Sequence, residues 1–314
     1  ALILAGAGSG KTRVLTTRIA WLLSTGQVSP GGVLAVTFTN KAAKEMLTRL
    51  TSMLPVNVRG MWIGTFHGLC NRFLRAHWKL AGLPQGFQIL DASDQVAAVK
   101  RVVKAMALDE ERFPPKQAAY FISGSKEEGL RPHDIVATDP HTAKLIEVYA
   151  AYEAQCQREG VVDFGELMLR SYELMRDNDA VREHYRRRFA HVLVDEFQDT
   201  NKLQYKWLQM FAPPEQPKGV FAVGDDDQSI YAFRGAQVGN MADFEREYRV
   251  PQVIKLEQNY RSYAHILDAA NALIAHNTKR LGKNLRTDAG LGEPVRVMEA
   301  TSDYGEAQWL LDEA

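Results

Sequence analysis

AGAGSGKT, residues 5–12, follows the short apolar run ALIL at the start of the chain. Its three glycines allow a tight backbone turn that aims successive N–H groups inward, which makes an anion-binding nest at a helix N-terminus. Lys11 can then reach the β- and γ-phosphates of a nucleotide, and the Thr12 hydroxyl can ligate Mg²⁺. Ala5 stands where the strict pattern has glycine, but a small residue still fits. The sequence therefore predicts a phosphate-binding loop between a strand and a helix.

Length and charge limit the class of protein. With 314 residues, of which 46% are hydrophobic, the chain can bury a large core and is expected to form two or more domains. Lys plus Arg and Asp plus Glu both number 38. Residues 1–66, however, hold seven basic side chains and one acidic, a local charge of +6. This local charge suits ATP or nucleic acid, although a solvated face explains it equally well.

Two cysteines, Cys70 and Cys156, lie too far apart in the sequence for metal-ligand spacing and cannot form a disulfide framework, which favours the reducing cytoplasm. No apolar run reaches membrane-spanning length. The apolar opening has no basic residues before it and leads straight into the phosphate loop, so it is not typical of a signal peptide. We interpret the start of the chain as a point within a longer protein.

Strand-like runs recur at 33–36 (VLAV), 192–194 (VLV), 220–223 (VFAV) and 253–256 (VIKL), each followed by polar or glycine-containing sequence. This pattern is typical of buried parallel strands with ligand groups at their carboxyl ends. Between 67 and 190 the periodicity becomes helical, as in residues 94–108 and 142–158, where Gly160 is placed to end the second helix. We expect an α/β domain with a largely helical insertion.

HVLVDEFQD, residues 191–199, is an apolar strand that ends in two carboxylates. In a protein with a phosphate loop, Asp195 can hold Mg²⁺, usually through water, and Glu196 can take a proton from the attacking water. An isolated Asp-Glu pair is more often a solvated surface feature. The preceding strand and the upstream phosphate loop favour the catalytic interpretation.

GDDDQSIYAFRGA, residues 224–236, follows the next strand. Its three acids would repel one another if buried, so the turn must be solvated or near cations. Gln228 can sense a γ-phosphate or orient water. Tyr231 and Phe233 alternate with Arg234, which suits stacking on bases and contact with phosphate, although core packing explains two aromatic residues about as well. Further on, QNYRS (258–262) offers a ring at 260 and a cation at 261 that can cap adenine and contact phosphate.

Seven blocks in this order resemble the UvrD/PcrA/Rep group of superfamily 1 DNA helicases across the whole chain: AGAGSGKTR, AVTFTNKAAKEM, GTFHGLC, VDFGELM, LVDEFQDT, VGDDDQSIYAFRGA and LEQNYRS. The resemblance implies an ATP-driven motor that moves 3′ to 5′ on single-stranded DNA between two RecA-like domains. Residues 1–66 and 191–256 would form the first RecA-like P-loop NTPase domain with its parallel sheet. Residues 67–190 would form the helical insertion, and residues 257–314 the start of the second RecA-like domain.

The resemblance also implies residue roles. ATP would be held by Gly6, Ala7, Gly8, Ser9, Gly10, Lys11, Thr12 and Arg13, with Mg²⁺ at Thr12 and Asp195. Glu196 would be the base, Gln228 and Arg261 would contact the γ-phosphate, and Tyr260 would stack on adenine. DNA would contact Phe38, Thr39, Asn40, Thr65, His67, Tyr231, Phe233 and Arg234. For His67, packing is the alternative to DNA contact, while a metal role is not favoured because no Cys or His lies at ligand spacing.

The chain departs from the family pattern in places. Many relatives have Trp at position 233 and Gly at position 232, where this chain has Phe and Ala, so the grip on bases is expected to be weaker. The family's adenine-reading glutamine would lie before Ala1, and its arginine finger after Ala314. The 314-residue chain alone is therefore expected to hydrolyse ATP weakly, far more slowly than the longer protein. Two alternatives stay open: a helicase-nuclease subunit, and a module that binds ATP and single-stranded DNA with little turnover. Single-strand/duplex junctions are the expected substrate in DNA repair or replication, with unknown protein partners.

Overall fold

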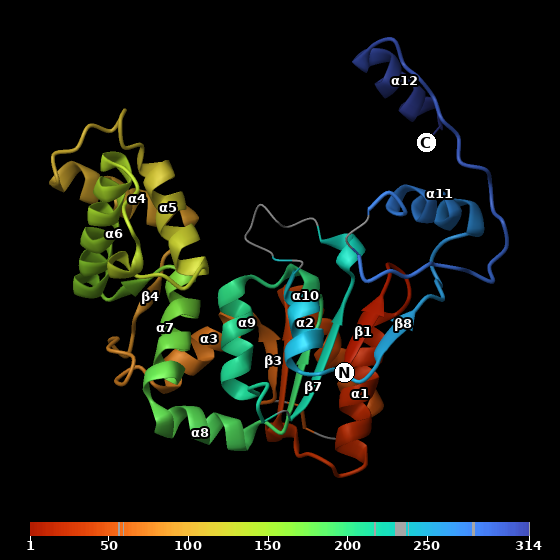
Figure 1. The fold of residues 1–314 in the computed structure, drawn as a ribbon, viewed down its shortest axis with the longest axis horizontal. Coiled ribbons are helices and arrows are strands. Elements are labelled where there is room, and N and C mark those ends of the chain that lie inside the picture. Colours follow the sequence, from red (N-terminus) through yellow and green to blue (C-terminus); the bar gives the residue numbers. More distant parts are fainter. Residues whose placement is uncertain are drawn as a thin grey trace.

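The computed structural model of the protein describes residues 1–55, 57–58, 60–216, 218–229, 237, 239–277 and 280–313. A six-stranded sheet lies at its centre, with strand order β3-β2-β6-β7-β1-β8, and every pairing is parallel (Figure 1). The strands are β1 (Leu2–Ala5), β2 (Val33–Thr37), β3 (Trp62–Thr65), β6 (His191–Val194), β7 (Gly219–Gly224) and β8 (Val253–Leu256). Strands that are far apart in the sequence are therefore neighbours, as in doubly wound α/β proteins.

The sheet is buried on both faces, because alternate side chains of each strand enter different cores. Leu2 and Leu4 of β1 pack into one core, whereas Ile3 packs into the other. Helices α1 (Lys11–Ser24) and α2 (Asn40–Met53) cover the Ile3 face. The opposite face is covered by α3 (Phe66–Ala76), α7 (Phe164–Asp177), α8 (Asp179–Arg188), α9 (Lys202–Phe211) and α10 (Gly239–Glu247). The result is a three-layer α/β/α arrangement that leaves the strand ends accessible.

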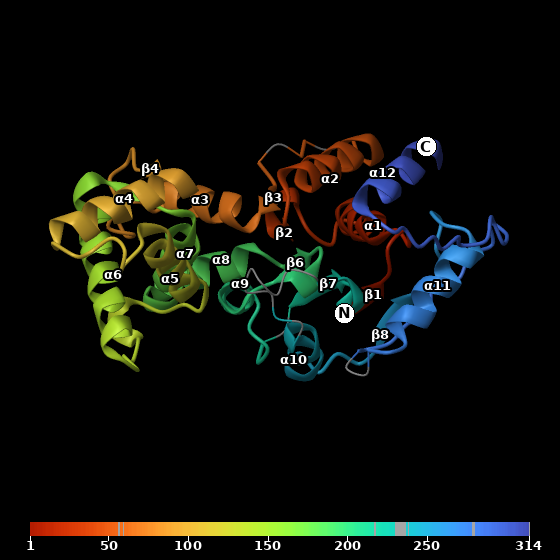
Figure 2. The same ribbon diagram turned by 90° about the horizontal axis from the view of Figure 1, so that it is seen from above.

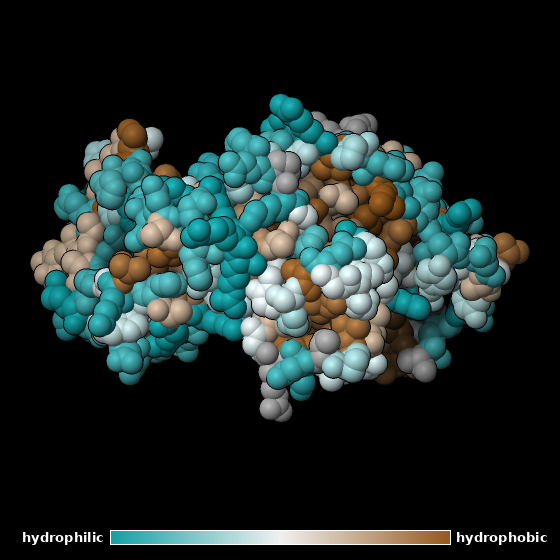
Figure 3. All heavy atoms as spheres, turned by 90° about the horizontal axis from the view of Figure 1, so that it is seen from below, coloured by the Kyte–Doolittle hydropathy of each residue, from teal (hydrophilic) through white to brown (hydrophobic). Residues whose placement is uncertain are grey.

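A helical insertion stands beside this sheet, on the left of Figures 1 and 2. Its own core is formed by α4 (Ala92–Ala105), α5 (Pro115–Glu127) and α6 (Pro140–Glu159). Two short strands, β4 (Gln88–Ile89) and β5 (Val161–Val162), pair in parallel within it. Helices α3 and α7 connect the insertion to the main core. On the face drawn in Figure 3, hydrophilic side chains cover much of the insertion, and hydrophobic ones gather over the sheet-containing half.

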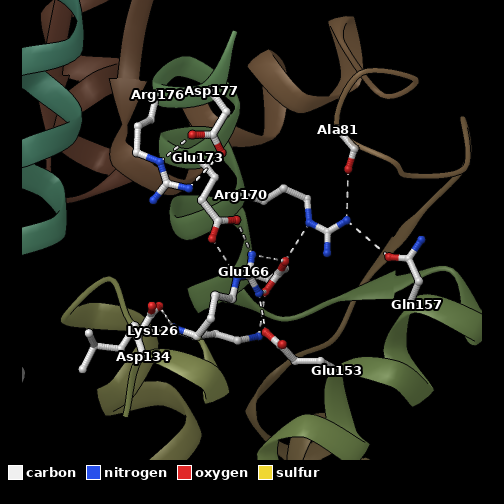
Figure 4. Close-up of polar contacts among 12 residues, drawn as sticks. Ala81, Lys126, Asp134, Glu153, Gln157, Glu166, Arg170, Glu173, Arg176 and Asp177 are labelled. Atoms are coloured by element: carbon white, nitrogen blue, oxygen red, sulfur yellow. Dashed lines mark hydrogen bonds and ion pairs between the residues drawn. The ribbon is translucent and has the colours of Figure 1, made fainter. Parts of the chain in front are cut away.

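A buried ion network joins the helices of the insertion (Figure 4). Glu166 at the start of α7 accepts hydrogen bonds from Arg131 (2.9 and 3.0 Å) and Arg170 (2.6 Å), and it lies 2.9 Å from the Lys126 Nζ on α5. Lys126 also donates to Asp163 at 2.8 Å, and both side chains are 2% exposed. Each buried charge thus has opposite charges around it, as burial requires. The network fixes the turn between β5 and α7.

Beyond β8 the chain forms α11 (Ala264–Ile274) and α12 (Asp303–Glu313), joined by an extended segment (Figure 1). Apolar side chains on this part are largely exposed; they include Leu273, Val297, Tyr304 and Leu311. Asn259 and Tyr260, just after β8, donate hydrogen bonds to the loop after β1, and the Leu285 side chain lies against Gly6 of that loop. This segment therefore contributes directly to the site described below.

The predicted fold class, a P-loop α/β sheet with a helical insertion, is confirmed. The runs predicted at 33–36, 192–194, 220–223 and 253–256 lie in β2, β6, β7 and β8. Helix α6 covers the predicted stretch 142–158, and α4 covers 94–105 of the stretch predicted to run to 108. Gly160 has φ 68° and ends α6, as expected. Strand β3 and the small β4–β5 sheet were not predicted. Strand β3 (WIGT) is broken by Gly64, and β4 and β5 have two residues each, so none of them forms an apolar run like those of the predicted strands.

Candidate nucleotide site and adjoining groove

All six strands of the central sheet end at one edge, where their polar motifs meet. Residues 6–10, which we call the phosphate-type loop, follow β1. TFTN follows β2, and GTFH spans the end of β3. DEFQD, GDDDQ and EQNYRS follow β6, β7 and β8. Parallel topology alone therefore brings together residues as far apart in the sequence as Ala7 and Asn259.

The loop after β1 has the conformation that its glycines permit. Gly8 and Gly10 have φ angles of 71° and 88°, in the left-handed region. The Ser9 hydroxyl donates to the Gly6 carbonyl at 2.7 Å, and α1 begins directly afterwards at Lys11. The first N–H groups of a helix have no intrahelical acceptors, so they can bind phosphate oxygens. The loop is thus shaped to hold an anion.

Lys11 and Thr12 face the acidic pair at the end of β6. The Lys11 ammonium, on a residue only 9% exposed, lies 3.5 Å from the Glu196 carboxylate. The Thr12 hydroxyl donates to Asp195 at 3.2 Å. Burial and the neighbouring Glu196 raise the pKa of Asp195 to about 6. A hydroxyl and a buried carboxylate with raised pKa fit Mg²⁺, because a hard divalent cation prefers oxygen ligands and relieves the repulsion between the two acids.

Glu196 is held in place by its backbone and by a glutamine. Its φ of 50° is unusual for a residue other than glycine, and such strain is often found at functional sites. The Gln198 amide donates to the Glu196 carboxylate at 2.8 Å and accepts from the Asp225 N–H at 2.8 Å. Gln198 therefore links the acidic pair after β6 to the GDDDQ turn after β7. Within that turn, Gln228 donates to the Asp225 carboxylate.

QNYRS closes over the phosphate-type loop. The Asn259 amide donates to the Ala7 carbonyl at 2.6 Å, and the Tyr260 N–H donates to the Gly8 carbonyl at 2.9 Å. A Cβ atom on Gly8 would lie 2.6 Å from the Cβ of Arg261, so only glycine fits at that position. Tyr260 is 79% exposed, which leaves its ring free to stack on a planar ligand. Two segments at opposite ends of the sequence thus build one site.

These segments enclose a cavity of about 1080 Å³, which we call the nucleotide cavity. It is comparable to the upper end of the 300–1,000 Å³ range of typical ligand sites. Its lining includes Arg13, Gln228, Tyr260 and Arg261 along with Lys11, Thr12 and Glu196. Gly6, Ala7, Gly8, Ser9 and Gly10 also line it, so the structure gathers all the residues assigned to ATP from the sequence.

A second hollow of about 650 Å³, which we call the groove, lies between the ends of β2 and β3 and the insertion. Phe38, Thr39, Thr65 and His67, four of the residues assigned to DNA from the sequence, line it. Phe38 packs edge-on against Phe66 with ring centroids 5.4 Å apart. The hydroxyls of Thr39 and Thr65 cap α2 and α3, accepting from backbone N–H groups at 3.1 Å. These caps fix the orientation of both helices beside the groove.

The other residues assigned to DNA from the sequence are Asn40, Tyr231, Phe233 and Arg234. Asn40 is exposed at the start of α2 and is not among the groove-lining residues. Tyr231, Phe233 and Arg234 lie outside the described residues. Burial lowers the pKa of His67, which favours its neutral form. In the described part of the chain, the group of His, Cys, Asp and Glu side chains close enough for a metal ion is Asp225–Asp227, which does not include His67.

Three site residues were missed from the sequence. Phe164 lines the groove opposite the strand ends, is 49% exposed, and meets the His67 ring edge-on at 5.8 Å. Gln198 links two motifs, and Asn259 binds the phosphate-type loop. The signal for Gln198 was its place two residues after Glu196. For Phe164 and Asn259 the sequence offers only their motifs, VDFGELM and QNYRS, without a geometric cue.

A phosphate-type loop, an acidic pair at a neighbouring strand end and a cavity at the carboxyl edge of a parallel sheet define the class: a P-loop nucleotide-binding α/β protein. Comparisons with known proteins narrow this class. The family model described as UvrD/REP helicase N-terminal domain matches residues 1–249, and the UvrD-like helicase C-terminal domain matches residues 254–314. The chain belongs to the UvrD/REP helicase family.

Individual relatives agree with this assignment. DNA helicase II of Escherichia coli strain K12 is 52% identical over 312 residues, which cover 99% of this chain and 43% of that protein. DNA helicase II of Haemophilus influenzae is 51% identical over 314 residues, 98% of this chain and 43% of the relative. The ATP-dependent DNA helicase PcrA of Leuconostoc citreum is 42% identical over 313 residues, 99% of this chain and 42% of the relative. The chain thus spans less than half the length of these relatives, and the resemblance seen in its motifs is confirmed.

Proposed function

We propose that the chain is the ATP-binding part of a motor that moves 3′ to 5′ on single-stranded DNA and opens single-strand/duplex junctions. The observation that carries this proposal is that Glu196 and Gln228 line both the nucleotide cavity and the groove. A group shared by two sites can respond to the occupancy of both, as coupling of DNA binding to ATP hydrolysis requires. The relatives are named as DNA helicases, which supports the choice of DNA.

The proposed division of the chain follows the sheet. Residues 1–66 and 191–256 supply all its strands and form the first RecA-like domain. Residues 67–190 form the helical insertion, and residues 257–314 begin the second RecA-like domain. Both cysteines are buried and free, which supports the reducing cytoplasm as the proposed location. The role that we propose there is in DNA repair or replication. No helix in the described ranges is long and apolar enough to span a membrane.

In the proposed reaction, the loop of residues 6–13 cradles the phosphates, and Lys11 contacts the β- and γ-phosphates. Bound at Thr12 and Asp195, Mg²⁺ would neutralise charge on the phosphates. Glu196 takes the proton of the attacking water, because its carboxylate lies beside Lys11 and the cavity. Gln228 and Arg261 contact the γ-phosphate, and Tyr260 stacks on adenine.

For DNA, we propose that Phe38, His67 and Phe164 contact bases in the groove, together with Thr39, Asn40 and Thr65. Tyr231, Phe233 and Arg234 extend the same surface in the proposal, because they follow β7 at the same edge of the sheet. Base stacking on aromatic rings is tolerant of sequence. A motor that moves along any DNA requires such contacts.

The test of the whole proposal is ATP hydrolysis by the protein with and without a single-stranded oligonucleotide. We expect hydrolysis that the oligonucleotide accelerates, and an equal length of duplex to be a weaker activator. Binding of ATP and of the oligonucleotide without turnover would instead support a binding module. Failure to bind nucleotide at all would contradict both.

We expect Phe38→Ala and Phe164→Ala each to weaken single-strand binding by roughly 1 to 3 kcal/mol, with little dependence on base sequence. This is about fivefold to a hundredfold in Kd. Arg234→Ala is expected instead to reduce the salt dependence of binding, because a phosphate contact is lost. Titrations with oligonucleotides at several salt concentrations measure both effects.

A matched control is Tyr120→Ala, because Tyr120 is an exposed aromatic residue of the insertion, 67% exposed, that does not line the groove. It should bind DNA normally. Phe38 also contacts Phe66, so its removal can destabilise the fold as well as remove a stacking contact with DNA. Melting curves of each variant distinguish the two effects. Normal DNA affinity in a folded Phe38→Ala, Phe164→Ala double variant would contradict the proposed groove function.

A further inference from the structure

The acidic turn after β7 is held by a strap from the far end of the chain. We define the strap as residues 280–285, which follow α11 and lie within the part matched by the C-terminal family model. Arg280 donates to both carboxylate oxygens of Asp227, at 2.9 and 2.7 Å. The Leu281 N–H donates to Asp226 at 2.6 Å. Lys283 donates to Asp225 and, at 2.8 Å, to Asp227.

Charge explains why these contacts form together. The three consecutive acids bring their carboxylates within 4.8 Å of one another, and Asp225 and Asp226 are 2% and 8% exposed. Buried like charges repel, so the turn needs cations beside it. The Lys283 ammonium supplies one, on a side chain that is 2% exposed. Burial acts to lower the pKa of Lys283, but hydrogen bonds to Asp225 and Asp227 raise it, so the lysine stays charged.

Asp225 connects the strap to the nucleotide cavity. One carboxylate oxygen accepts from Lys283 and the other accepts from Gln228. The Asp225 N–H donates to Gln198, whose amide donates in turn to Glu196. Both Gln228 and Glu196 line the nucleotide cavity. A single carboxylate thus separates a lysine of the strap from a residue assigned to the γ-phosphate.

We propose that Lys283 is a positioning residue for ATP hydrolysis, which holds Asp225 so that Gln228 and, through Gln198, Glu196 keep their orientation toward the nucleotide. The inference rests on the proposed ATPase function and adds a requirement to it. The catalytic arrangement after β6 and β7 is complete only when the strap is docked on the turn. Separation of the strap from the turn would break the ion pair between Lys283 and Asp225. The Asp225 carboxylate, which accepts a hydrogen bond from Gln228, would then no longer be held in place.

The test compares Lys283→Met with Lys104→Met. Lys104 is an exposed lysine on α4, in the insertion and outside the cavity lining. We expect Lys283→Met to lower kcat for ATP about tenfold, the effect of one hydrogen bond to a charged group on a barrier, with KM changed less than twofold. Lys104→Met should behave like the unchanged protein.

Two further measurements distinguish positioning from simple loss of folding. Asp225→Asn, which keeps the shape of the side chain, should lose the same factor in kcat. Adding Lys283→Met to Gln228→Ala should lower kcat little further, because both act through one group. The proposal would be overturned if the double variant lost kcat by the full product of the two single losses. An unchanged kcat in folded Lys283→Met would also overturn it.

Hydrogen exchange of the amides of residues 224–229 reads the docking of the strap without any turnover. We expect faster exchange in Lys283→Met and unchanged exchange in Lys104→Met. If the unchanged protein fails to hydrolyse ATP while this exchange difference is present, the proposed ATPase function fails and the strap contact stands. If exchange is the same in all three proteins, the positioning role is wrong whatever the turnover.

Discussion

Glu196→Gln is expected to bind ATP·Mg²⁺ normally and to hydrolyse it on the order of 10² to 10⁴ times more slowly, the usual contribution of a positioned general base. The amide keeps the size of the side chain and its hydrogen bond with Gln198, but it cannot take a proton from water. Fluorescent-nucleotide titration and a steady-state turnover assay in the same buffer measure the two effects.

The matched variant is Lys11→Ala, which should lose tight nucleotide binding itself. Lys11 is the first residue of α1, and its ammonium lies 3.5 Å from the Glu196 carboxylate. Without this positive charge, the nearby acids would repel a bound phosphate. The two variants therefore separate binding from chemistry. Unchanged hydrolysis in Glu196→Gln would remove Glu196 as the base, and tight binding by Lys11→Ala would remove the loop as the phosphate site.

Glu166→Gln is expected to destabilise the helical insertion by about 3 to 5 kcal/mol, because it removes one partner from a buried ion network. Lys126, Arg131 and Arg170 all contact this carboxylate, which is buried in the network shown in Figure 4. Hydrogen exchange of amides in α5 and α7 at neutral pH measures the loss locally. The control is Glu159→Gln, whose partner Arg101 is 56% exposed and whose surface pair should contribute no more than about 1 kcal/mol.

The stability difference between the unchanged protein and Glu166→Gln is expected to depend on pH. Burial alone would raise the pKa of Glu166, but Lys126, Arg131 and Arg170 hold it well below its ordinary value. A carboxyl with a lowered pKa in the folded state stabilises the fold above its unfolded pKa of about 4.3 and loses that contribution as the pH falls. Urea unfolding at a series of pH values should therefore show the gap between the unchanged protein and Glu166→Gln narrowing below about pH 4. A constant gap would contradict this assignment.

Much of the nucleotide site could be predicted from the sequence because its residues sit in contiguous motifs at strand ends. The rule that carboxyl ends of parallel strands share an edge then brings Lys11, Asp195 and Gln228 together without any structure. The three acids of GDDDQ illustrate the limit of this reasoning. Their mutual repulsion predicted either solvent or cations, and the structure places Arg280 and Lys283 there.

The remaining contacts could not be predicted, because they join segments through side chains that no spacing rule relates. Phe164 reaches the groove from the insertion, a hundred residues from β3, and the ion network around Glu166 fixes the turn that carries it. The packing of Asn259 on Ala7 likewise depends on β8 lying beside β1. The roles of Tyr231, Phe233 and Arg234 stay predictions, since these residues lie outside the described part of the chain.

Strand β8 has a practical consequence for dividing this protein into pieces. The two family models meet between residues 249 and 254, which suggests a natural cut for expression. A cut there would strip β8 from β1 and leave a row of unpaired backbone N–H and C=O groups along LILA, an open strand edge that invites self-association. It would also remove Leu285, whose side chain covers Gly6 closely enough to exclude a Cβ atom. A well-behaved N-terminal piece should therefore extend past Arg286, into the region that sequence classification assigns to the next domain.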